Sequence, residues 1–360
     1  MIANKKIAFV IHSLGRGGAE KVVSELSIYW RNKGYSVTLI LFENEVGYPI
    51  GGELINLNLP SGDGFFERVF ILLKRAWHLK KVYAKQQFDL IIAVMETASF
   101  PSIMVNSQTI ASNHCNPSLY FSQAEWKLAA SLFPKAKKVV CVSEIAKQAF
   151  QSRLPSETPL TTIYNPVDFV SLADFSTKSP SIKIEEKYII AVGRLEPQKR
   201  IDRLLNAYAD SKLSHEAKLL ILGEGSLRPQ LEQQIKNLGL VGQVLMPGNI
   251  ENPHPNIARA EFLVLASDHE GFPMVLIEAL AIGKPVVSTD CATGPNEIIQ
   301  HGQNGLLVPV ENTLALRDAL DELYFNQPLH QYLSHNAAAS VRHLSVDTIA
   351  AQWEALAWKP

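Results

Sequence analysis

Short apolar segments alternate with longer segments of helical periodicity along almost the whole sequence. The apolar segments have the length of buried strands and form two series, near residues 6–12, 36–42, 89–95, 108–112 and 138–142, and near 187–192, 217–222, 243–246, 261–265 and 285–287. Strands that alternate with helices predict parallel sheets joined by crossover helices. We therefore expect an α/β protein with two doubly wound, Rossmann-like domains that face each other across a ligand-binding cleft.

The segment between the two series, Asn165 to Lys187, is rich in proline, serine and charged residues and predicts a linker. A chain of 360 residues is long enough for two cores of ordinary size. We predict an amino-terminal domain over residues 1–170 and a carboxyl-terminal domain over 171–340. The segment 341–360 contains the helical pattern VDTIAAQWEALAW, and we expect it to pack back on the amino-terminal domain.

The composition describes a globular protein without a nucleic-acid partner. Hydrophobic residues make up 47% and charged residues 19%, and the formal net charge is -1, so no overall field attracts nucleic acid. The three cysteines lie far apart in the sequence and predict buried thiols rather than a disulfide or a zinc site. No apolar run reaches the length of a membrane span. We expect a cytoplasmic protein, in solution or peripheral on the inner face of the cytoplasmic membrane.

A glycine-rich loop, HSLGRGGAEKVV, follows the first apolar segment. Gly15 and Gly17 have the spacing of a dinucleotide-binding turn, and Glu43 stands at the end of the second strand, where such folds place an acidic residue. However, Glu20 occupies the position of the third glycine. The match is therefore partial, and the loop can equally serve another ligand.

Two cationic side chains follow the first strand of the second series, in AVGRLEPQKRIDRLL. Arg194 and Lys199 come after Gly193 and before a helix predicted to start near Ile201. Cations beside a helix amino terminus form a site for a diphosphate. The alternative is a pair of solvated surface cations.

Two carboxylates lie eight positions apart in SDHEGFPMVLIEAL. Glu270 ends a loop, Gly271 to Pro273 form a tight turn, and a helix is predicted to start near Met274. Glu278 then lies just over one turn inside this helix, on the side that faces the loop. Such a pair can hold two sets of hydroxyls, while the free N–H groups of the turn face phosphates between them.

The segment EGFPMVLIE, with Glu270 and Glu278 at its ends, resembles the signature of retaining glycosyltransferases of family 4, which have the GT-B fold. The resemblance spans nearly the whole chain. It includes GGAEKVV at Gly17, NPVD at Asn165, GRLEPQK at Gly193 and HGQNGLLVP at His301. It implies that the glycine loop serves the donor diphosphate or the acceptor, with no bulk at Gly17 and Gly18, rather than a nicotinamide cofactor.

The resemblance also implies a role for each matching residue. Arg194 and Lys199 neutralise the departing diphosphate, Glu278 holds the ribose hydroxyls, and Glu270 holds the hydroxyls of the transferred sugar. The loop that ends at Ile250 holds the base, and His114 in ASNHCNPS lies near the sugar. The implied catalytic residues are Glu270, Lys199, Arg194 and His114. The implied donor-binding residues are Gly17, Gly18, Gly193, Arg194, Lys199, Ile250, Glu270, Gly271, Phe272, Pro273, Met274, Val275 and Glu278.

The implied activity is transfer of a hexose or N-acetylhexosamine from a nucleoside-diphosphate sugar, with UDP as the majority donor of the family. The implied acceptor is a lipid-linked glycan of bacterial surface-polysaccharide synthesis. No cofactor and no essential metal are expected, because the nearest Asp-x-Asp match is Asp268-His269-Glu270, whose Glu270 belongs to the other motif. A UDP-sugar epimerase and a non-catalytic nucleotide-sugar-binding subunit are the alternatives. The chain departs from the family at Gly294-Pro295, where many members carry two glycines.

One locally basic segment, residues 64–87, predicts an amphipathic helix. Its predicted apolar stripe consists of Phe66, Val69, Phe70, Leu73, Ala76 and Trp77. Lys74, His78, Lys81 and Lys85 follow another face at helical spacing. The stripe either packs into the core or, as basic aromatic helices do, docks on an anionic membrane surface or a lipid diphosphate.

Overall fold

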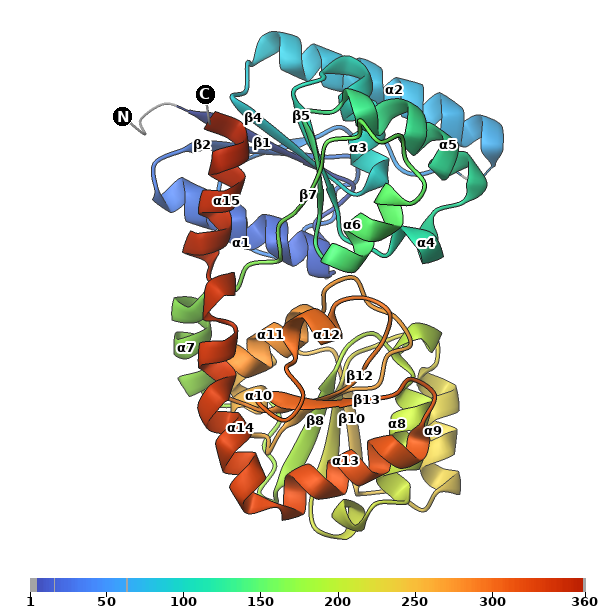
Figure 1. Cartoon of the computed structure of the whole chain (residues 1–360), viewed down its shortest axis with the longest axis vertical. Helices are drawn as coiled ribbons and strands as arrows, with labels where there is room; N and C mark the ends of the chain where they lie inside the picture. The colour runs from blue at the N-terminus through green and yellow to red at the C-terminus, as the bar shows by residue number, and fades with distance from the viewer. Residues whose placement is uncertain (1–4, 16, 63, 359–360) are drawn as a thin grey trace. The chain divides into compact units, whose positions relative to one another are not determined.

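The computed structural model of the protein describes residues 5–15, 17–62 and 64–358. The chain forms two compact units (Figure 1). Unit 1 consists of the described parts of Met1–Pro166 and Val346–Pro360, and unit 2 of Val167–Ser345. The chain thus leaves unit 1 within the predicted linker and returns to it after Ser345.

Unit 1 contains a parallel sheet of seven strands in the order β3-β2-β1-β4-β5-β6-β7. The strands are β1 (Lys6–Ile11), β2 (Ser36–Leu41), β3 (Glu53–Asn56), β4 (Leu90–Val94), β5 (Thr109–Asn113), β6 (Lys138–Cys141) and β7 (Leu160–Thr162). The helices are α1 (Gly18–Asn32), α2 (Phe65–Lys85), α3 (Glu96–Val105), α4 (Pro117–Tyr120), α5 (Gln123–Leu132), α6 (Glu144–Gln151) and α15 (Val346–Trp358), with a short 3-10 turn η1 (Phe133–Lys135).

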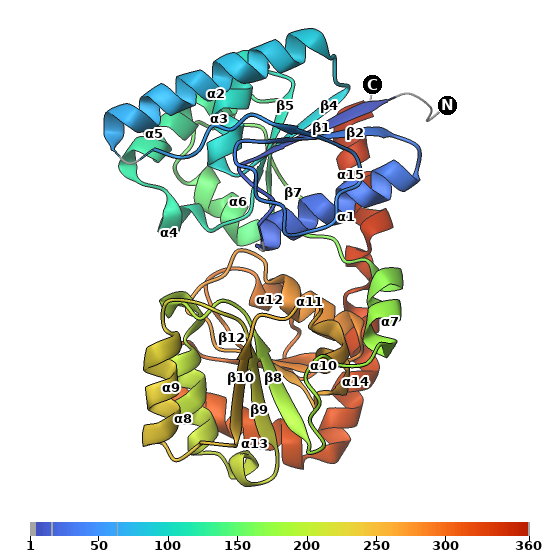
Figure 2. The same cartoon turned by 180° about the vertical axis from the view of Figure 1, so that it is seen from behind.

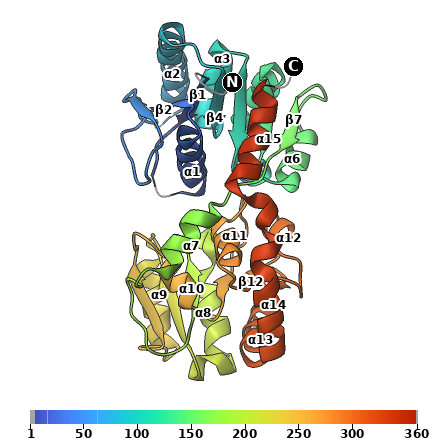
Figure 3. The ribbon, with the colours of Figure 1, turned by 90° about the vertical axis from the view of Figure 1, so that its left-hand side faces the viewer.

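Helices cover both faces of this sheet, which is why its central strands are apolar throughout. On one face, Leu79 of α2, Ala98 of α3 and Val10 of β1 belong to one hydrophobic core. On the other face, Trp30 of α1 stacks on Phe9 of β1, with ring centroids 5.6 Å apart. Figure 3 shows α2 and α15 on opposite sides of the sheet.

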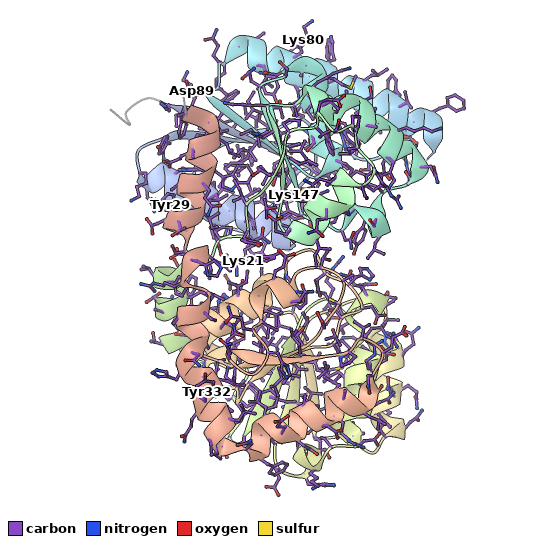
Figure 4. All side chains as sticks on the ribbon, viewed as in Figure 1. Lys21, Tyr29, Lys80, Asp89, Lys147 and Tyr332 are labelled. Atoms are coloured by element: carbon purple, nitrogen blue, oxygen red, sulfur yellow. The ribbon has the colours of Figure 1, made fainter. Side chains whose placement is uncertain are left out.

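The helix α15 belongs to unit 1 although it follows unit 2 in the sequence. The indole Nε1 of Trp30 donates to Glu354 Oε1 at 2.9 Å. The hydroxyl of Tyr29, labelled in Figure 4, donates to Asp347 Oδ1 at 3.0 Å. These contacts join α15 to α1, so unit 1 is built from two separate stretches of sequence.

Unit 2 contains a parallel sheet of six strands in the order β10-β9-β8-β11-β12-β13. The strands are β8 (Tyr188–Val192), β9 (Lys218–Leu222), β10 (Val244–Gly248), β11 (Leu263–Leu265), β12 (Val286–Thr289) and β13 (Gly305–Val308). The helices are α7 (Phe169–Thr177), α8 (Ile201–Ala209), α9 (Arg228–Asn237), α10 (His254–Arg259), α11 (Met274–Ala281), α12 (Pro295–Ile298), α13 (Thr313–Phe325) and α14 (Gln327–Ser340). Short 3-10 turns occur at η2 (Pro197–Lys199), η3 (Lys212–His215) and η4 (Arg342–Leu344).

The strand order of unit 2 reverses between β8 and β11, which are hydrogen-bonded neighbours. Parallel strands end at the same edge of a sheet, and the loops that follow two strands at such a reversal leave a crevice between them. The loops after β8 and β11 carry Lys199 and Glu270. The topology therefore brings two of the predicted site residues to one place.

The structure confirms the predicted α/β class and all ten strands predicted from apolar segments. It adds the edge strands β3, β7 and β13, which those segments did not predict. Cys115, Cys141 and Cys291 are buried thiols, as expected. Within the described part of the chain, no helix has both the length and the hydropathy needed to cross a bilayer.

Candidate functional site

The loop after β8 is held in a defined shape by backbone contacts. Gly193 N donates to Leu222 O at 3.0 Å, and Leu195 N donates to Glu224 O at 2.8 Å. A Cβ at Gly223 would collide with the carbonyl oxygen of Gly193, and a Cβ at Gly225 would collide with the backbone of Leu195. The two glycines, which the sequence analysis did not single out, therefore let this loop lie directly against its neighbour.

Lys199 and Glu270 form an ion pair at the crevice, with Lys199 Nζ 2.6 Å from Glu270 Oε1. The side chains are 15% and 8% exposed, so water screens the pair only weakly. The hydroxyl of Ser267 donates to the same Oε1 at 2.6 Å. One carboxylate oxygen of Glu270 is thus held from two sides, which fixes the orientation of the carboxylate.

Asp268, the candidate metal ligand in the segment that most nearly matches Asp-x-Asp, forms ion pairs with two arginines. Arg200 Nη1 lies 2.9 Å from Asp268 Oδ2, and Arg203 Nη2 lies 2.7 Å from Oδ1. Burial alone would raise the pKa of Asp268, but the hydrogen bonds and charges of Arg200 and Arg203 outweigh it and lower the pKa. The carboxylate is therefore a structural link between the loops after β8 and β11, and a cation would have to displace two guanidinium groups from it.

Glu278 lies inside α11, which begins at Met274 as predicted. It is 5% exposed, and its Oε2 lies 3.1 Å from Nε2 of the buried His254. The other ring nitrogen of His254 lies 2.7 Å from Asn252 Oδ1, and the ring stacks on Phe175 at 5.9 Å. His254 is thus held on both edges and one face, and it orients the carboxylate of Glu278. No sequence motif marked His254, because its contacts come from distant segments.

The turn between the two carboxylates precedes α11 directly. Gly271 and Val275 are half-buried, whereas Phe272, Pro273 and Met274 are buried. Buried side chains in this turn and the first turn of α11 fix the backbone. The first N–H groups of an α-helix have no partner inside the helix, which makes them available to an anion.

Gly294 packs against this turn. Its φ is +92°, and a Cβ there would lie 2.6 Å from Pro273 Cδ and 3.1 Å from Gly271 O. Pro295 is the first residue of α12, where its missing N–H removes no intrahelical hydrogen bond. A proline at position 295, in place of the second glycine of the family pattern, therefore fits the start of α12.

Ile250 follows β10, at the same edge of the sheet but two strands from β8. It is half-buried, and it comes after Gly248, whose φ is +94°. Arg194 is exposed beside the same loop as Lys199. Unit 2 thus contains Gly193, Arg194, Lys199, Ile250, Glu270 to Val275 and Glu278 of the predicted site.

The remaining predicted site residues, Gly17, Gly18 and His114, belong to unit 1. Gly17 caps α1, and Gly18 is its first residue. His114 follows β5, and its Nε2 lies 2.9 Å from the hydroxyl of Ser112. Its Nδ1 is buried and has no hydrogen-bond partner among the described residues. Burial lowers the pKa of His114 to about 4, so the ring is neutral near pH 7.

Glu43, considered above as the acidic residue of a dinucleotide-binding fold, is paired with His12. Its Oε1 lies 3.2 Å from Nε2 of His12. Arg75 of α2 contacts the other ring nitrogen of His12 at 3.2 Å, and a guanidinium can only donate, so Nδ1 accepts and Nε2 carries the proton. This arrangement ties Glu43 to α2.

Two family models together match most of the chain. The model described as glycosyl transferases group 1 matches residues 174–340, and the model described as glycosyltransferase family 4 matches residues 16–170. The first lies entirely within unit 2 and the second almost entirely within unit 1.

Two relatives from Campylobacter jejuni match over most of their length. One, named N-acetylgalactosamine-N,N'-diacetylbacillosaminyl-diphospho-undecaprenol 4-alpha-N-acetylgalactosaminyltransferase, is 30% identical over 351 residues, covering 92% of this chain and 94% of that protein. The other, an alpha-1,4-N-acetyl-D-galactosaminyltransferase named for an undecaprenol-linked glycan, is 26% identical and covers 97% of each chain.

Two solved structures share the fold. Sucrose-phosphate synthase from Thermosynechococcus elongatus has a TM-score of 0.83 at 20% identity and covers 98% of each chain. The Anabaena protein HepE, solved with UDP and glucose, has a TM-score of 0.79 at 23% identity, covering 97% of this chain and 98% of that one. Together with the two parallel sheets, these likenesses confirm the predicted GT-B fold class.

Proposed function

Because the chain belongs to the glycosyltransferases of group 1 and family 4, we propose that it transfers a sugar from a nucleoside-diphosphate sugar to a lipid-linked glycan, with retention at the anomeric carbon. We further propose UDP as the nucleotide and an N-acetylhexosamine or hexose as the sugar. The observation that carries this proposal is the pairing of Lys199 with Glu270 at the strand-order reversal of unit 2.

The pairing matches the order of groups along a nucleotide sugar. The sugar is bonded directly to the outer phosphate, so a cation that contacts the phosphate and a carboxylate that contacts the sugar hydroxyls must be neighbours. Lys199 and Glu270 lie 2.6 Å apart. Because Lys199 and Ser267 both contact Oε1, Glu270 can present Oε2 to a sugar hydroxyl. Glu278, oriented by His254, serves the ribose at the other end of the diphosphate.

The proposed reaction places negative charge on the departing diphosphate. The bond between the anomeric carbon and the phosphate oxygen breaks, and the acceptor hydroxyl forms the new bond on the same face. The hydroxyl proton passes to the leaving phosphate. Lys199, Arg194 and the backbone N–H groups of the turn before α11 stabilise that charge, so no metal ion is required.

The lipid-linked acceptor is proposed from the relatives. Both Campylobacter jejuni proteins are named for undecaprenol-diphosphate-linked glycans, and one is 30% identical to this chain. The test uses the full chain with a panel of nucleotide sugars and a synthetic undecaprenyl-diphosphate glycan. We expect thermal stabilisation by a UDP-sugar and release of UDP only when the acceptor is present.

The same assay separates the alternatives. An epimerase would convert the donor sugar without an acceptor, and a non-catalytic subunit would bind the donor without releasing UDP. NMR of the product determines the anomeric configuration, and an inverted linkage would contradict retention. Stabilisation by GDP-sugars alone would contradict the choice of nucleotide.

A further inference from the structure

We propose that α2 docks unit 1 on an anionic lipid bilayer. This proposal rests on the exposed face of α2 in unit 1 and not on the predicted donor-binding residues of unit 2. The predicted apolar stripe of this helix does not pack into the core, apart from Ala76. Five large apolar side chains of α2 are exposed: Phe66 by 87%, Val69 by 42%, Phe70 by 64%, Leu73 by 54% and Trp77 by 53%.

The opposite face of α2 is fixed to unit 1. Leu79 is fully buried, and Arg75 is only 4% exposed. Arg75 donates from Nε and Nη2 to the carbonyl of Leu59, at 3.2 and 2.9 Å, and its guanidinium lies 4.3 Å from the ring centroid of Phe42. Turning the apolar stripe inward would require breaking these bonds and burying lysines instead. The stripe is therefore a permanent surface of unit 1.

The exposed apolar residues form one continuous stripe. Phe66, Phe70, Leu73 and Trp77 follow each other at intervals of three or four residues, so they share one side of the helix. Figures 1 and 2 show α2 along the outer edge of unit 1, with no other element drawn beyond it. Single exposed apolar residues are ordinary, whereas a contiguous apolar patch marks an interaction site.

The charges around the stripe identify a bilayer as its partner. Exposed cations occur along the same helix at Arg68, Lys74, Lys80, Lys81 and Lys85, and the one acidic residue of α2 is Glu67. Figure 4 shows Lys80 pointing away from unit 1. In the described part of the chain, no ion pair is assigned to Lys74, Lys80, Lys81 or Lys85. A protein of net charge -1 thus concentrates cations around an aromatic stripe, as interfacial helices do on anionic lipid.

The stripe also has a direction. Four of its five large apolar residues, all except Trp77, occupy the amino-terminal half of α2, and Lys80, Lys81 and Lys85 occupy the carboxyl-terminal half. Lys81 Nζ lies 3.2 Å from the ring centroid of Trp77, where the two halves meet. Tryptophan favours the level of the lipid headgroups. We infer that the end with Phe66 and Phe70 enters the acyl boundary and that the lysine end contacts headgroup phosphates.

The test is sedimentation of the full chain with phosphatidylcholine vesicles, with and without phosphatidylglycerol. We expect binding to the anionic vesicles that weakens as salt is added, and at least about tenfold weaker binding of the triple variant Lys74→Glu, Lys81→Glu, Lys85→Glu. A matched variant, Lys183→Glu, Lys212→Glu, Lys236→Glu, makes the same charge change at exposed positions of unit 2 and should bind like the wild type. The variant Phe66→Ser, Phe70→Ser should also lose binding.

Three results would overturn the proposal. The first is that the wild type does not sediment with the vesicles, and the second is that the triple variant sediments as well as the wild type. The third is that the chain dimerises through the stripe and does not bind vesicles, which would make a second copy of the chain the partner of the stripe. Thermal stabilisation by UDP is measured on the same variants. The residues proposed to bind UDP through its diphosphate and ribose lie in unit 2, whereas α2 lies in unit 1. If UDP does not stabilise the wild type, that result counts against the proposed function and not against the membrane proposal.

Discussion

At the scale of single residues, Lys199 and Glu270 are each other's charged partner, and their side chains are only 15% and 8% exposed. We predict that Lys199→Met and Glu270→Gln each lower kcat at least about tenfold, because each removes a charge-assisted contact of roughly 1.5–3 kcal/mol. Lys218→Met is the control, since it breaks the pair with Glu186, which is 56% exposed. Wild-type turnover in both site variants, with the fold intact by circular dichroism, would remove these residues from the site.

Glu278 should act on donor binding rather than on the chemical step. We predict that Glu278→Gln raises the KM for the donor about tenfold and changes kcat little, because the proposed contact with the ribose would be the same in the ground state and the transition state. His254→Phe should shift KM in the same direction, since it removes the bond at 3.1 Å that orients Glu278. Steady-state kinetics decide this, and an unchanged KM in Glu278→Gln would refute the ribose assignment.

His114 should make the stability of unit 1 sensitive to acid. Its pKa is lowered to about 4 by burial, whereas an unfolded histidine titrates near pH 6.5. Between these values the unfolded state binds the proton more readily, so the free energy of unfolding falls as the pH falls, by up to about 1.4 kcal/mol per pH unit. We predict a shallower fall in His114→Gln, measured by urea unfolding at several pH values from 7 to 4. Parallel curves for the two proteins would contradict the neutral, buried state.

At the scale of elements, Gly223 sets the close contact between the loop after β9 and the loop after β8. We predict that Gly223→Ala lowers both the free energy of unfolding and donor affinity, because its Cβ would collide with Gly193 O in the backbone that precedes Lys199. Gly239→Ala is the matched control. Its φ is +68°, but a Cβ there meets nothing within 4 Å, so it carries only the conformational cost of about 1 kcal/mol. Equal effects of the two substitutions would mean that the collision is relieved elsewhere.

The sequence predicted ten strands because each of them lies in an apolar run. It did not predict β3, with the sequence ELIN, or β7, with the sequence LTT, since both are partly exposed edge strands without an apolar run. The apolar segments also missed the edge strand β13, whose sequence GLLV is only four residues long. The start of α11 at Met274 was predictable from the turn before it. Whether the apolar stripe of α2 faces the core or the solvent was not predictable, because the periodicity of a helix identifies an apolar face but not what packs against that face.

The candidate site shows the same division. Glu270, Glu278, Lys199 and Arg194 belong to local motifs, and their spacing along the chain was enough to predict them as site residues. His254 meets Glu278 only through the packing of α10 beside α11, so no sequence pattern links the two residues. The bonds from Arg200 and Arg203 to Asp268 are also tertiary contacts, and they give the Asp268-His269-Glu270 segment a structural role that its sequence did not reveal.

At the scale of the whole molecule, we predict full activity in excess EDTA. In the proposed reaction, Lys199, Arg194 and backbone N–H groups stabilise the charge of the leaving diphosphate, and Asp268 is already bound by two arginines. Transfer rates with and without EDTA, measured after removal of adventitious metal, decide the matter. Loss of activity that manganese or magnesium restores would favour a metal-dependent reaction instead.

The placement of α15 has a consequence for synthesis on the ribosome. Unit 2 is a continuous stretch, and it is held closed where its ends meet, since Val167 N donates to Leu344 O at 2.8 Å. All of its residues are present once Ser345 has been translated. Unit 1 begins earlier but is completed later, because Trp30 can bond to Glu354 only after all of unit 2 has been translated. The unit that starts first in the nascent chain is therefore the one completed last, and until then α1 exposes the surface that α15 will cover.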